Sequence, residues 1–397
     1  MWHENISKKL IYNDKMNVKT KIVSLFNFND PLKFETGDNL SPVQVAYQTY
    51  GELNEEGTNA ILVCHALTGN AHAAGILKEI ETDLNSNPDL LKKYSKINKG
   101  NVGWWDSLIG ENKVLDTNKY FVISSNILGS CYGTTGPVSI KNMFNRKYGL
   151  DFPTVTVRDM VKVQRKLLEH LGVNKLKTAI GGSLGGMQVL EWAIMYPEML
   201  ESIIPIATSV QHSAWAIALN QASRQAIEND PEWHKGNYKE QPLEGLSLAR
   251  KIAMISYRSF DSFNSKFSRE RKDKNADKLD KENIFQIESY LNHHGVKINE
   301  RFDANTYLYL SNAMDLHDVA LNRGKLKDVL GSINIPTLSI GISSDILYPP
   351  QEQKDIAEMI PNSTYAEIDS IHGHDAFLIE FEQLEKIISL YFEKYNL

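Results

Sequence analysis

Short, largely apolar runs recur along the first half of the chain at the spacing expected of buried strands. Residues 60–64 (AILVC) and 120–124 (YFVIS) are bounded by polar segments and are typical of strands covered on both faces. Apolar and polar residues alternate at 43–49, which predicts strands within residues 22–50. The same patterns predict further strands at 178–180, 203–207, 335–340 and 364–368.

Two amphipathic helices separate the central runs. Over residues 160–171 apolar side chains recur three and four positions apart, and Gly172 follows as a stop signal. A second helix is predicted at 185–196, before Pro197. Strands and helices that alternate in this way predict a parallel sheet with crossover helices, and therefore an α/β fold.

The alternation stops at residues 210–325, which are polar and helical in pattern and contain no convincing strand. The strand pattern resumes after this segment. We therefore expect an α/β core formed by residues 1–209 and 326–397, interrupted by a helical insertion at 210–325.

Three polar segments complete the organisation of the chain. Residues 1–20 are expected to form a loose leader, and the Lys- and Asn-rich residues 76–100 a helical insertion. Residues 266–281 carry a dense mixture of acidic and basic side chains. This mixture favours a solvated helix face over a basic surface for a partner.

Composition narrows the class of protein. The 397 residues are 42% hydrophobic and 23% charged, with a net charge of −6, as in ordinary soluble globular proteins. There is no basic excess to bind nucleic acid or an anionic membrane, and no apolar run long enough for a transmembrane helix. Cys64 and Cys131 are the only cysteines, so no disulfide framework is expected. The N-terminus lacks a signal-peptide core, and a cytoplasmic enzyme is the default expectation.

The segment Gly181-Gly182-Ser183-Leu184-Gly185 carries the clearest chemistry. A Gly-x-Ser-x-Gly sequence between a strand and a helix is the pattern of a nucleophile elbow, in which a strained serine is exposed at a sharp turn. The alternative is a plain glycine-rich turn, but the predicted strand before Ser183 and helix after it favour the elbow.

A serine needs an adjacent base, and in folds with this elbow an acid and then a histidine follow it in the chain. Asp345 comes just after a predicted strand, although it could instead cap a helix before Pro349. His372 and His374 both follow the last predicted strand, and spacing alone does not choose between them.

The loop after strand 60–64 is a candidate oxyanion hole. In α/β hydrolases a backbone N–H from this loop and the N–H after the nucleophile bind the developing negative charge, here those of Leu67 and Leu184. Histidine pairs such as His293-His294 lack further ligands at metal-binding spacing, so no metal site is expected.

Several ordered motifs resemble homoserine O-acetyltransferases. They lie at residues 64–75, 103–106, 126–137, 151–153, 181–191, 301–305, 313–315 and 373–378. The resemblance runs from about residue 20 to the C-terminus. It implies an α/β-hydrolase fold, with a mostly parallel sheet, flanking helices and an inserted helical lid, and a homodimer. Two features depart from the family pattern, namely the length of residues 76–100 and His372, where the family usually has an aromatic residue.

The resemblance also implies roles for individual residues. Ser183 would be the nucleophile, Asp345 the orienting acid and His374 the base, with Arg224 and Asp375 contacting the amino-acid substrate. A guanidinium suits the carboxylate of a zwitterion and a carboxylate suits its ammonium group. The alternatives are a surface ion pair for Arg224 and a hydrogen bond within its own loop for Asp375.

The expected reaction is acetyl transfer from acetyl-CoA to the γ-hydroxyl of L-homoserine through acetyl-Ser183, with ping-pong kinetics, in methionine biosynthesis. Acetyl-CoA is then a co-substrate, and no cofactor is bound permanently. Alternatives within the family are a succinyl donor or a serine acceptor. A simple carboxylesterase and a non-catalytic binding protein are the alternatives outside it.

Overall fold

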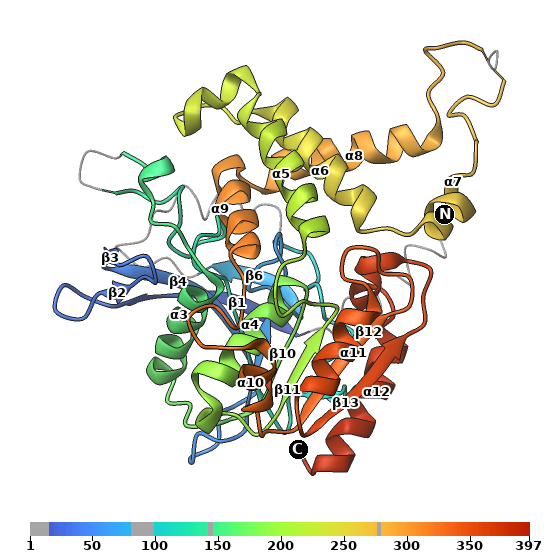
Figure 1. Cartoon of the computed structure of the whole chain (residues 1–397). Coiled ribbons are helices and arrows are strands. Elements are labelled where there is room, and N and C mark those ends of the chain that lie inside the picture. The colour runs from blue at the N-terminus through green and yellow to red at the C-terminus, as the bar shows by residue number, and fades with distance from the viewer. Residues whose placement is uncertain (1–15, 81–98, 142–145, 276–278) are drawn as a thin grey trace.

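The computed structural model describes residues 16–80, 99–141, 146–275 and 279–397. Its centre is a nine-stranded sheet (Figure 1). In spatial order the strands are β13 (Ser363–Ile368), β12 (Thr337–Ile342), β11 (Ile203–Ile206), β10 (Leu176–Gly182), β5 (Ala60–Cys64), β9 (Phe121–Ser125), β4 (Val43–Tyr50), β1 (Asn17–Leu25) and β6 (Ile76–Ile80). The strands from β13 to β9 are parallel, and β4 is antiparallel to both of its neighbours. The expected mostly parallel α/β sheet is confirmed.

Alternate residues of the central strands pack into cores on opposite faces of the sheet. Leu62 of β5 belongs to one core and Ile61 to the other, because successive side chains of a strand point to opposite faces. The helices α3 (Val157–His170), α4 (Leu184–Met195), α10 (Leu326–Gly331) and α11 (Pro350–Met359) supply the first core, and α12 (Phe381–Tyr395) the second. Burial on both faces explains why these strands are continuous apolar runs.

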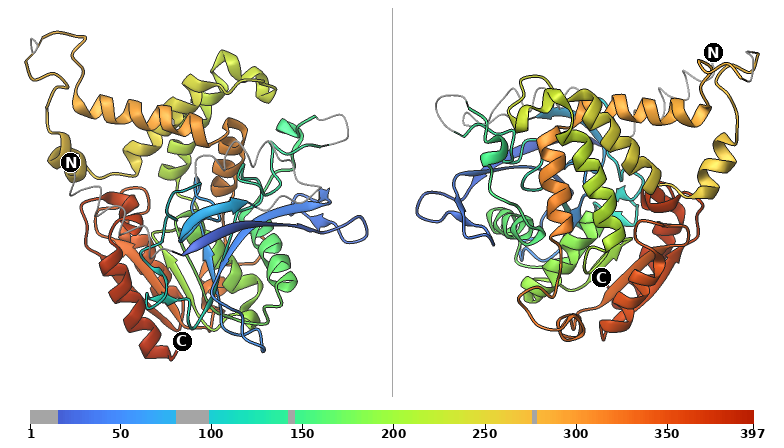
Figure 2. Two further views of the ribbon diagram at one scale, coloured as in Figure 1. Left: turned by 180° about the vertical axis from the view of Figure 1, so that it is seen from behind. Right: turned by 45° about the horizontal axis from the view of Figure 1, so that its top comes forward.

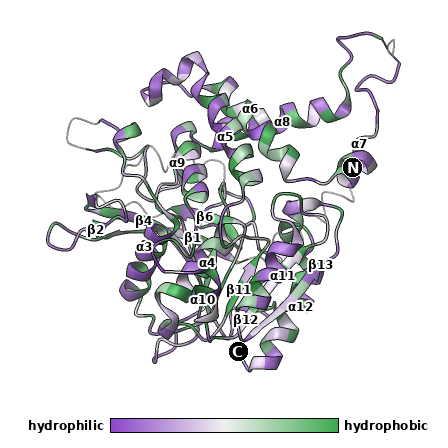
Figure 3. Ribbon diagram, in the orientation of Figure 1, coloured by the Kyte–Doolittle hydropathy of each residue, from purple (hydrophilic) through white to green (hydrophobic). Residues whose placement is uncertain are grey.

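The helices of the insertion are α5 (Ala214–Glu228), α6 (Leu243–Ser256), α7 (Phe260–Phe267), α8 (Gln286–Arg301) and α9 (Ala304–Asp315). Figures 1 and 2 show α5, α6, α8 and α9 stacked over one end of the sheet. Hydrophobic and hydrophilic residues alternate along them (Figure 3), as in helices with one packed face. All five lie within the predicted insertion 210–325, whose limits as a domain stay a prediction.

Shorter elements connect the sheet and the helices. Two small ladders pair β2 (Leu32–Lys33) with β3 (Asn39–Leu40) and β7 (Ile109–Gly110) with β8 (Leu115–Asp116). The 3-10 turns are η1 (Gly149–Asp151), η2 (Pro197–Met199), η3 (Pro231–Gly236) and η4 (Gly373–Leu378).

The structure corrects the expectations for three polar segments. Residues 76–80 form a strand rather than a helix, because Ile76 and Leu77 are buried and pair with β1. Residues 17–20 belong to β1 and not to a loose leader. Residues 1–15 and 81–98 lie outside the described part of the chain.

The predicted charged helix at 266–281 is also wrong. Helix α7 ends at Phe267, and the described residues from 268 to 285 form turns, bends and an isolated antiparallel bridge between Arg271 and Phe285. The side chain of Asn283 accepts a hydrogen bond from the Asp273 N–H at 3.0 Å and donates to its carbonyl at 2.8 Å. Such side-chain bonds give the backbone partners outside a helix.

A buried ion cluster ties the helices behind the sheet together. The carboxylate of Glu191 on α4 is 1% exposed and lies 3.1 Å from Arg158 Nε on α3 and 2.7 Å from Arg323 Nη1. Arg158 also pairs with Glu35 at 2.8 Å. The cluster therefore fixes α4, the helix that begins next to Ser183, against its neighbours.

We predict that Glu191→Gln lowers the free energy of unfolding by about 3–5 kcal/mol, because it leaves two enclosed guanidinium groups short of one charge. Urea unfolding monitored by circular dichroism measures the change. Glu201→Gln is the matched control, since Glu201 forms a 2.8 Å pair with Lys177 that is more exposed. The control is expected to cost at most about 1 kcal/mol. Equal losses in the two variants would contradict the prediction.

Candidate active site

Ser183 lies on the turn between β10 and α4 with φ 59° and ψ −126°, a conformation that is strained for a residue with a side chain. Its N–H donates to the Ile206 carbonyl at 2.9 Å, and its carbonyl accepts from Thr208 Oγ1 at 2.8 Å. The neighbouring strand thus holds the turn. The strained serine that the Gly-x-Ser-x-Gly pattern predicts is present in the structure.

The glycines of this turn have a steric reason. A Cβ at Gly181 would lie 2.6 Å from the carbonyl oxygen of Cys64, and one at Gly185 would overlap the same oxygen. The backbones of β5 and the turn are in direct contact here, and only glycine, which has no side chain, leaves room for that contact.

His374 is held by Asp345. The Nδ1 atom of His374 lies 2.7 Å from Asp345 Oδ2, and both side chains are almost completely buried. The other carboxylate oxygen of Asp345 accepts hydrogen bonds from the N–H groups of Leu347 at 2.8 Å and Tyr348 at 3.0 Å. Asp345 therefore orients His374 and is itself oriented by its own turn, which also accounts for its capping pattern in the sequence.

The surroundings favour protonation of His374. Burial acts to lower the pKa of His374, but the charge and hydrogen bond of Asp345 and the charge of Asp375 outweigh it, so the pKa is raised above 6.5. The rings of Tyr257, Tyr348 and Phe377 surround the imidazole, with centroids 5.7, 5.2 and 5.6 Å away. The imidazole of His374 thus packs among aromatic rings, while Asp345 favours its protonated form.

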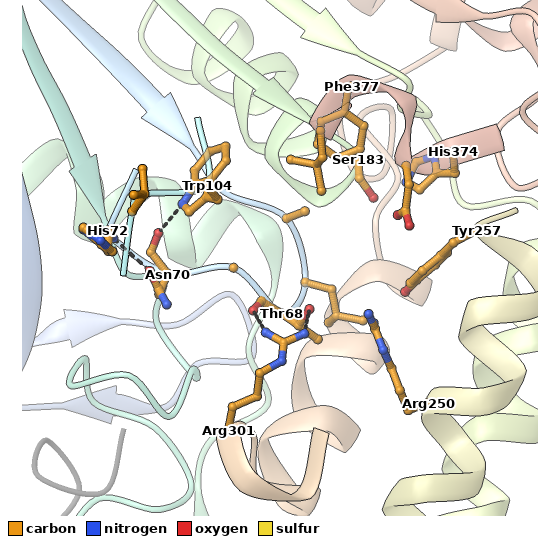
Figure 4. Close-up of a pocket in the computed structure, with 16 residues that line it drawn as sticks. Thr68, Asn70, His72, Trp104, Ser183, Arg250, Tyr257, Arg301, His374 and Phe377 are labelled. Carbon is orange, nitrogen blue, oxygen red and sulfur yellow. Dashed lines mark hydrogen bonds between the residues drawn. The ribbon is translucent and has the colours of Figure 1, made fainter. Parts of the chain in front are cut away.

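Ser183 and His374 border one cavity of about 300 Å³ under the insertion (Figure 4). His372 does not line this cavity, so the geometry favours His374 where spacing alone left the choice open. The cavity wall also includes Asp375 and two guanidinium groups, those of Arg250 on α6 and Arg301 at the end of α8.

The loop after β5 forms another wall of the cavity. Leu67 lines it, and Leu184 begins α4 beside Ser183. Within the described residues, neither backbone N–H has a hydrogen-bond acceptor. An oxyanion hole requires unpaired N–H groups near the nucleophile, and Leu67 and Leu184 are candidates for this role.

His65 fixes this loop and is not a base. Its Nδ1–H donates to the Ala66 carbonyl at 2.8 Å, and its Nε2 accepts from the Ile127 N–H at 3.2 Å. Burial lowers the pKa of His65 to about 4, so the ring is neutral at neutral pH.

The charged residues of the cavity differ in how they are neutralised. Asp375 pairs with Arg258 at 3.2 Å. In the described part of the chain no carboxylate lies within ion-pair distance of Arg250, which packs 5.6 Å from the centroid of the Tyr257 ring. Burial, and then the charge of Arg301, lower the pKa of Arg250. An anionic group that enters the cavity would offset the repulsion between the positive charges of Arg250 and Arg301.

Residues 59–381 match the model of the alpha/beta hydrolase fold family. A homoserine O-acetyltransferase from Carboxydothermus hydrogenoformans is 47% identical over 386 residues, which cover 95% of this chain and 97% of that protein. The chain belongs to the homoserine O-acetyltransferase family.

Solved structures agree with this assignment. The crystal structure of homoserine O-acetyltransferase from Bacillus anthracis superimposes with a TM-score of 0.82 at 30% identity, covering 95% of this chain and 98% of that one. Esterase E22 superimposes with a TM-score of 0.80 at 29% identity, covering 94% of this chain and 99% of that one. The fold of the homoserine O-acetyltransferase family is thus close to that of an ester hydrolase.

Two absences hold for the described residues. No cluster of three His, Cys, Asp or Glu side chains there could hold a metal ion. None of the described helices is both long and apolar enough to cross a membrane.

The structure does not bring Arg224 to the cavity. Its Nη2 lies 2.6 Å from Asp315 Oδ2, so its charge is already neutralised by an ion pair, which is largely buried and not on the surface as the alternative had it. Asp315 also accepts from His212 Nδ1 at 2.9 Å, and His212 Nε2 lies 2.9 Å from the Tyr348 hydroxyl. Arg224 therefore joins a network that ends at the ring packed on His374.

Arg250, Tyr257 and Arg301 are among the cavity residues to which sequence reasoning gave no role. Arg301 begins one of the family-like motifs, which was a usable signal. Arg250 had none, because it and Arg224 are both arginines on amphipathic helices of the insertion. The structure distinguishes the two arginines, because Arg224 pairs with Asp315 whereas Arg250 lines the cavity.

We predict that the His374 imidazole titrates with a pKa above 6.5, because Asp345 stabilises the protonated ring. Asp345→Asn removes that charge and is expected to lower this pKa. Nuclear magnetic resonance of ¹⁵N-labelled histidines measures both values. His65 serves as an internal reference that stays neutral until the pH approaches about 4. A wild-type His374 pKa below 6.5 would contradict the prediction.

Proposed function

We propose that this enzyme transfers an acetyl group from acetyl-CoA to the γ-hydroxyl of L-homoserine. The observation that carries the proposal is that Ser183, on a strained turn, and an Asp345-bound His374 line one cavity. The same cavity holds the guanidinium of Arg250, which has no carboxylate partner among the described residues. The relatives named homoserine O-acetyltransferase support the choice of substrates.

In the first half-reaction Ser183 attacks the thioester carbonyl of acetyl-CoA. His374 takes the hydroxyl proton, and Asp345 stabilises the imidazolium that forms. The N–H groups of Leu67 and Leu184 bind the oxyanion of the tetrahedral intermediate, and one such donor is worth roughly 3–4 kcal/mol. The C–S bond then breaks, the CoA thiolate takes the proton from His374, and acetyl-Ser183 remains.

In the second half-reaction the γ-hydroxyl of homoserine attacks acetyl-Ser183. His374 accepts the hydroxyl proton and returns it to Ser183 Oγ as O-acetyl-L-homoserine leaves. Two successive transfers through one acyl-enzyme give ping-pong kinetics.

The charged groups of the cavity suit a zwitterionic acceptor. Arg250 has no carboxylate partner among the described residues and can pair with the α-carboxylate of homoserine. Asp375 lines the same cavity and can accept from the α-ammonium group, sharing its charge with Arg258. This assigns the carboxylate contact to Arg250 rather than to Arg224.

Ester hydrolysis is the competing function, since esterase E22 has a closely similar fold. Water discharges any acyl-serine that it can reach. The insertion covers the cavity, and the charge of Arg250, which has no carboxylate partner among the described residues, would stay unpaired with a neutral ester. Both features favour transfer to a bound amino acid.

We also propose a homodimer in the cytoplasm. Leu248 and Ile255 lie seven residues apart on the same face of α6 and are each about half exposed, at 50% and 51%. An apolar pair of this kind on the insertion fits a contact with a second copy. The proposed donor, acetyl-CoA, is an intracellular thioester, which supports the location.

Mass spectrometry of protein quenched after mixing with acetyl-CoA alone tests the covalent step. The expected adduct is one acetyl group on the peptide that contains Ser183, and Ser183→Ala should abolish both adduct and transfer. His374→Ala should slow adduct formation by several orders of magnitude, because the triad acts as a unit. His372→Ala is the control and should change it little. An active enzyme with no acetyl-Ser183 would refute the scheme.

Arg250→Gln should lower kcat/KM for homoserine by about 10- to 150-fold, because a charge-assisted pair worth about 1.5–3 kcal/mol is lost. The rate of acetylation by acetyl-CoA should be retained, since that step contains no homoserine. Arg224→Lys is the comparison variant and should stay within a few-fold of wild type, because lysine keeps a charge that can pair with Asp315. The reverse pattern would restore Arg224 as the carboxylate contact.

A further inference from the structure

We infer that Arg301 is a positioning residue that holds the loop after β5 so that the Leu67 N–H faces the reacting carbonyl. Through it, the helical insertion would set the rate of the acetylation step as well as binding the acceptor. The inference rests on the proposed function, because it assigns a role in forming acetyl-Ser183.

The contact joins the insertion to the core. Arg301 Nη1 donates to the Thr68 carbonyl at 3.1 Å, and Nη2 donates to Thr68 Oγ1 at 3.3 Å (Figure 4). Thr68 directly follows Leu67, so the two bonds hold the residue next to the one that carries the proposed oxyanion donor. A planar guanidinium can make both bonds at once, whereas an ammonium group cannot match that fork.

Arg301 itself is firmly placed. It is the last residue of α8, and Phe302 after it is completely buried with its ring 5.8 Å from that of Tyr132. The next residue, Asp303, caps α9 by accepting from the Thr306 N–H at 2.9 Å. The side chain of Arg301 therefore projects from a rigid junction between two helices.

The other anchors of the loop lie on either side of Thr68. The Ala66 carbonyl accepts from the Gly69 N–H at 2.9 Å, and the Asn70 carbonyl accepts from Trp104 Nε1 at 2.9 Å. Within the described residues, the carbonyl and hydroxyl of Thr68 have no partner other than Arg301. Without Arg301, the carbonyl and hydroxyl of Thr68 would lose the hydrogen bonds that the described residues give them.

A different role for Arg301 makes a different prediction. Arg301 lines the cavity together with Arg250, so it could serve only as a second ligand for the acceptor carboxylate. In that case loss of Arg301 would raise the KM for homoserine and leave the rate of acetylation by acetyl-CoA unchanged. Acetylation in the absence of homoserine therefore separates the two roles.

The experiment is rapid-quench measurement of CoA release and acetyl-Ser183 formation from acetyl-CoA without homoserine. Arg301→Lys should slow acetylation roughly 10- to 100-fold at saturating acetyl-CoA, part of the roughly 100- to 1,000-fold loss seen when an oxyanion donor is removed. The KM for acetyl-CoA should change little. Arg269→Lys, an exposed arginine of the same insertion, is the control and should acetylate at the wild-type rate.

Two further variants separate positioning from general damage to the fold. Thr68→Val keeps Arg301 and its bond to the carbonyl and removes only the hydroxyl bond, so it should slow acetylation by a few-fold. Arg301→Ala should regain rate on addition of guanidinium ion, which a merely unfolded fraction would not. Should Arg301→Lys fail to fold, these two measurements decide the question.

Acetylation of Arg301→Lys and Thr68→Val at the wild-type rate, with only the KM for homoserine raised, would overturn the inference and leave the proposed function intact. Absence of any acetyl-Ser183 in the wild-type enzyme would instead refute the proposed function, and the inference with it.

Discussion

The close approach of the β10–α4 turn to the end of β5 is the constraint on which the site depends. Gly181 and Gly185 pack against the carbonyl of Cys64, the last residue of β5. This contact sets Ser183, in its strained conformation, beside the loop that β5 leads into. One backbone contact therefore places both the nucleophile and the proposed oxyanion donor at Leu67, and any side chain at either glycine would separate them.

The parallel sheet brings in the remaining groups. Asp345 follows β12 and His374 follows β13, so both leave the sheet at the edge where β10 ends in Ser183. The 2.7 Å hydrogen bond between His374 Nδ1 and Asp345 Oδ2, together with the turn that orients Asp345, then fixes the two side chains against each other. The sheet and the turns after it supply the reacting groups and Asp375, and the insertion supplies the guanidinium of Arg250 that could bind a substrate carboxylate.

Local patterns in the sequence predict the sheet, the elbow and the order of Ser183, Asp345 and His374, because each depends on residues close in the chain. The features that the sequence did not predict depend on pairing between residues far apart in the chain. Residues 76–80 look polar as a whole, yet two of them are buried against β1. Likewise, nothing near Arg224 in the chain announces Asp315, ninety-one positions away, which neutralises it. The spacing of apolar residues along a helix does not indicate which charged side chains of distant helices will pair.

The arginines around the site show how such pairing divides roles among identical side chains. Arg224 is bound to Asp315, Arg258 to Asp375, and Arg301 to the backbone and hydroxyl of Thr68. A guanidinium that already has a carboxylate gains little from a second one, whereas an enclosed and unpaired guanidinium gains a great deal. Arg250 is the cavity arginine left without such a partner in the described part of the chain. The distribution of carboxylates, more than the positions of the arginines, therefore determines where an anionic substrate group would bind.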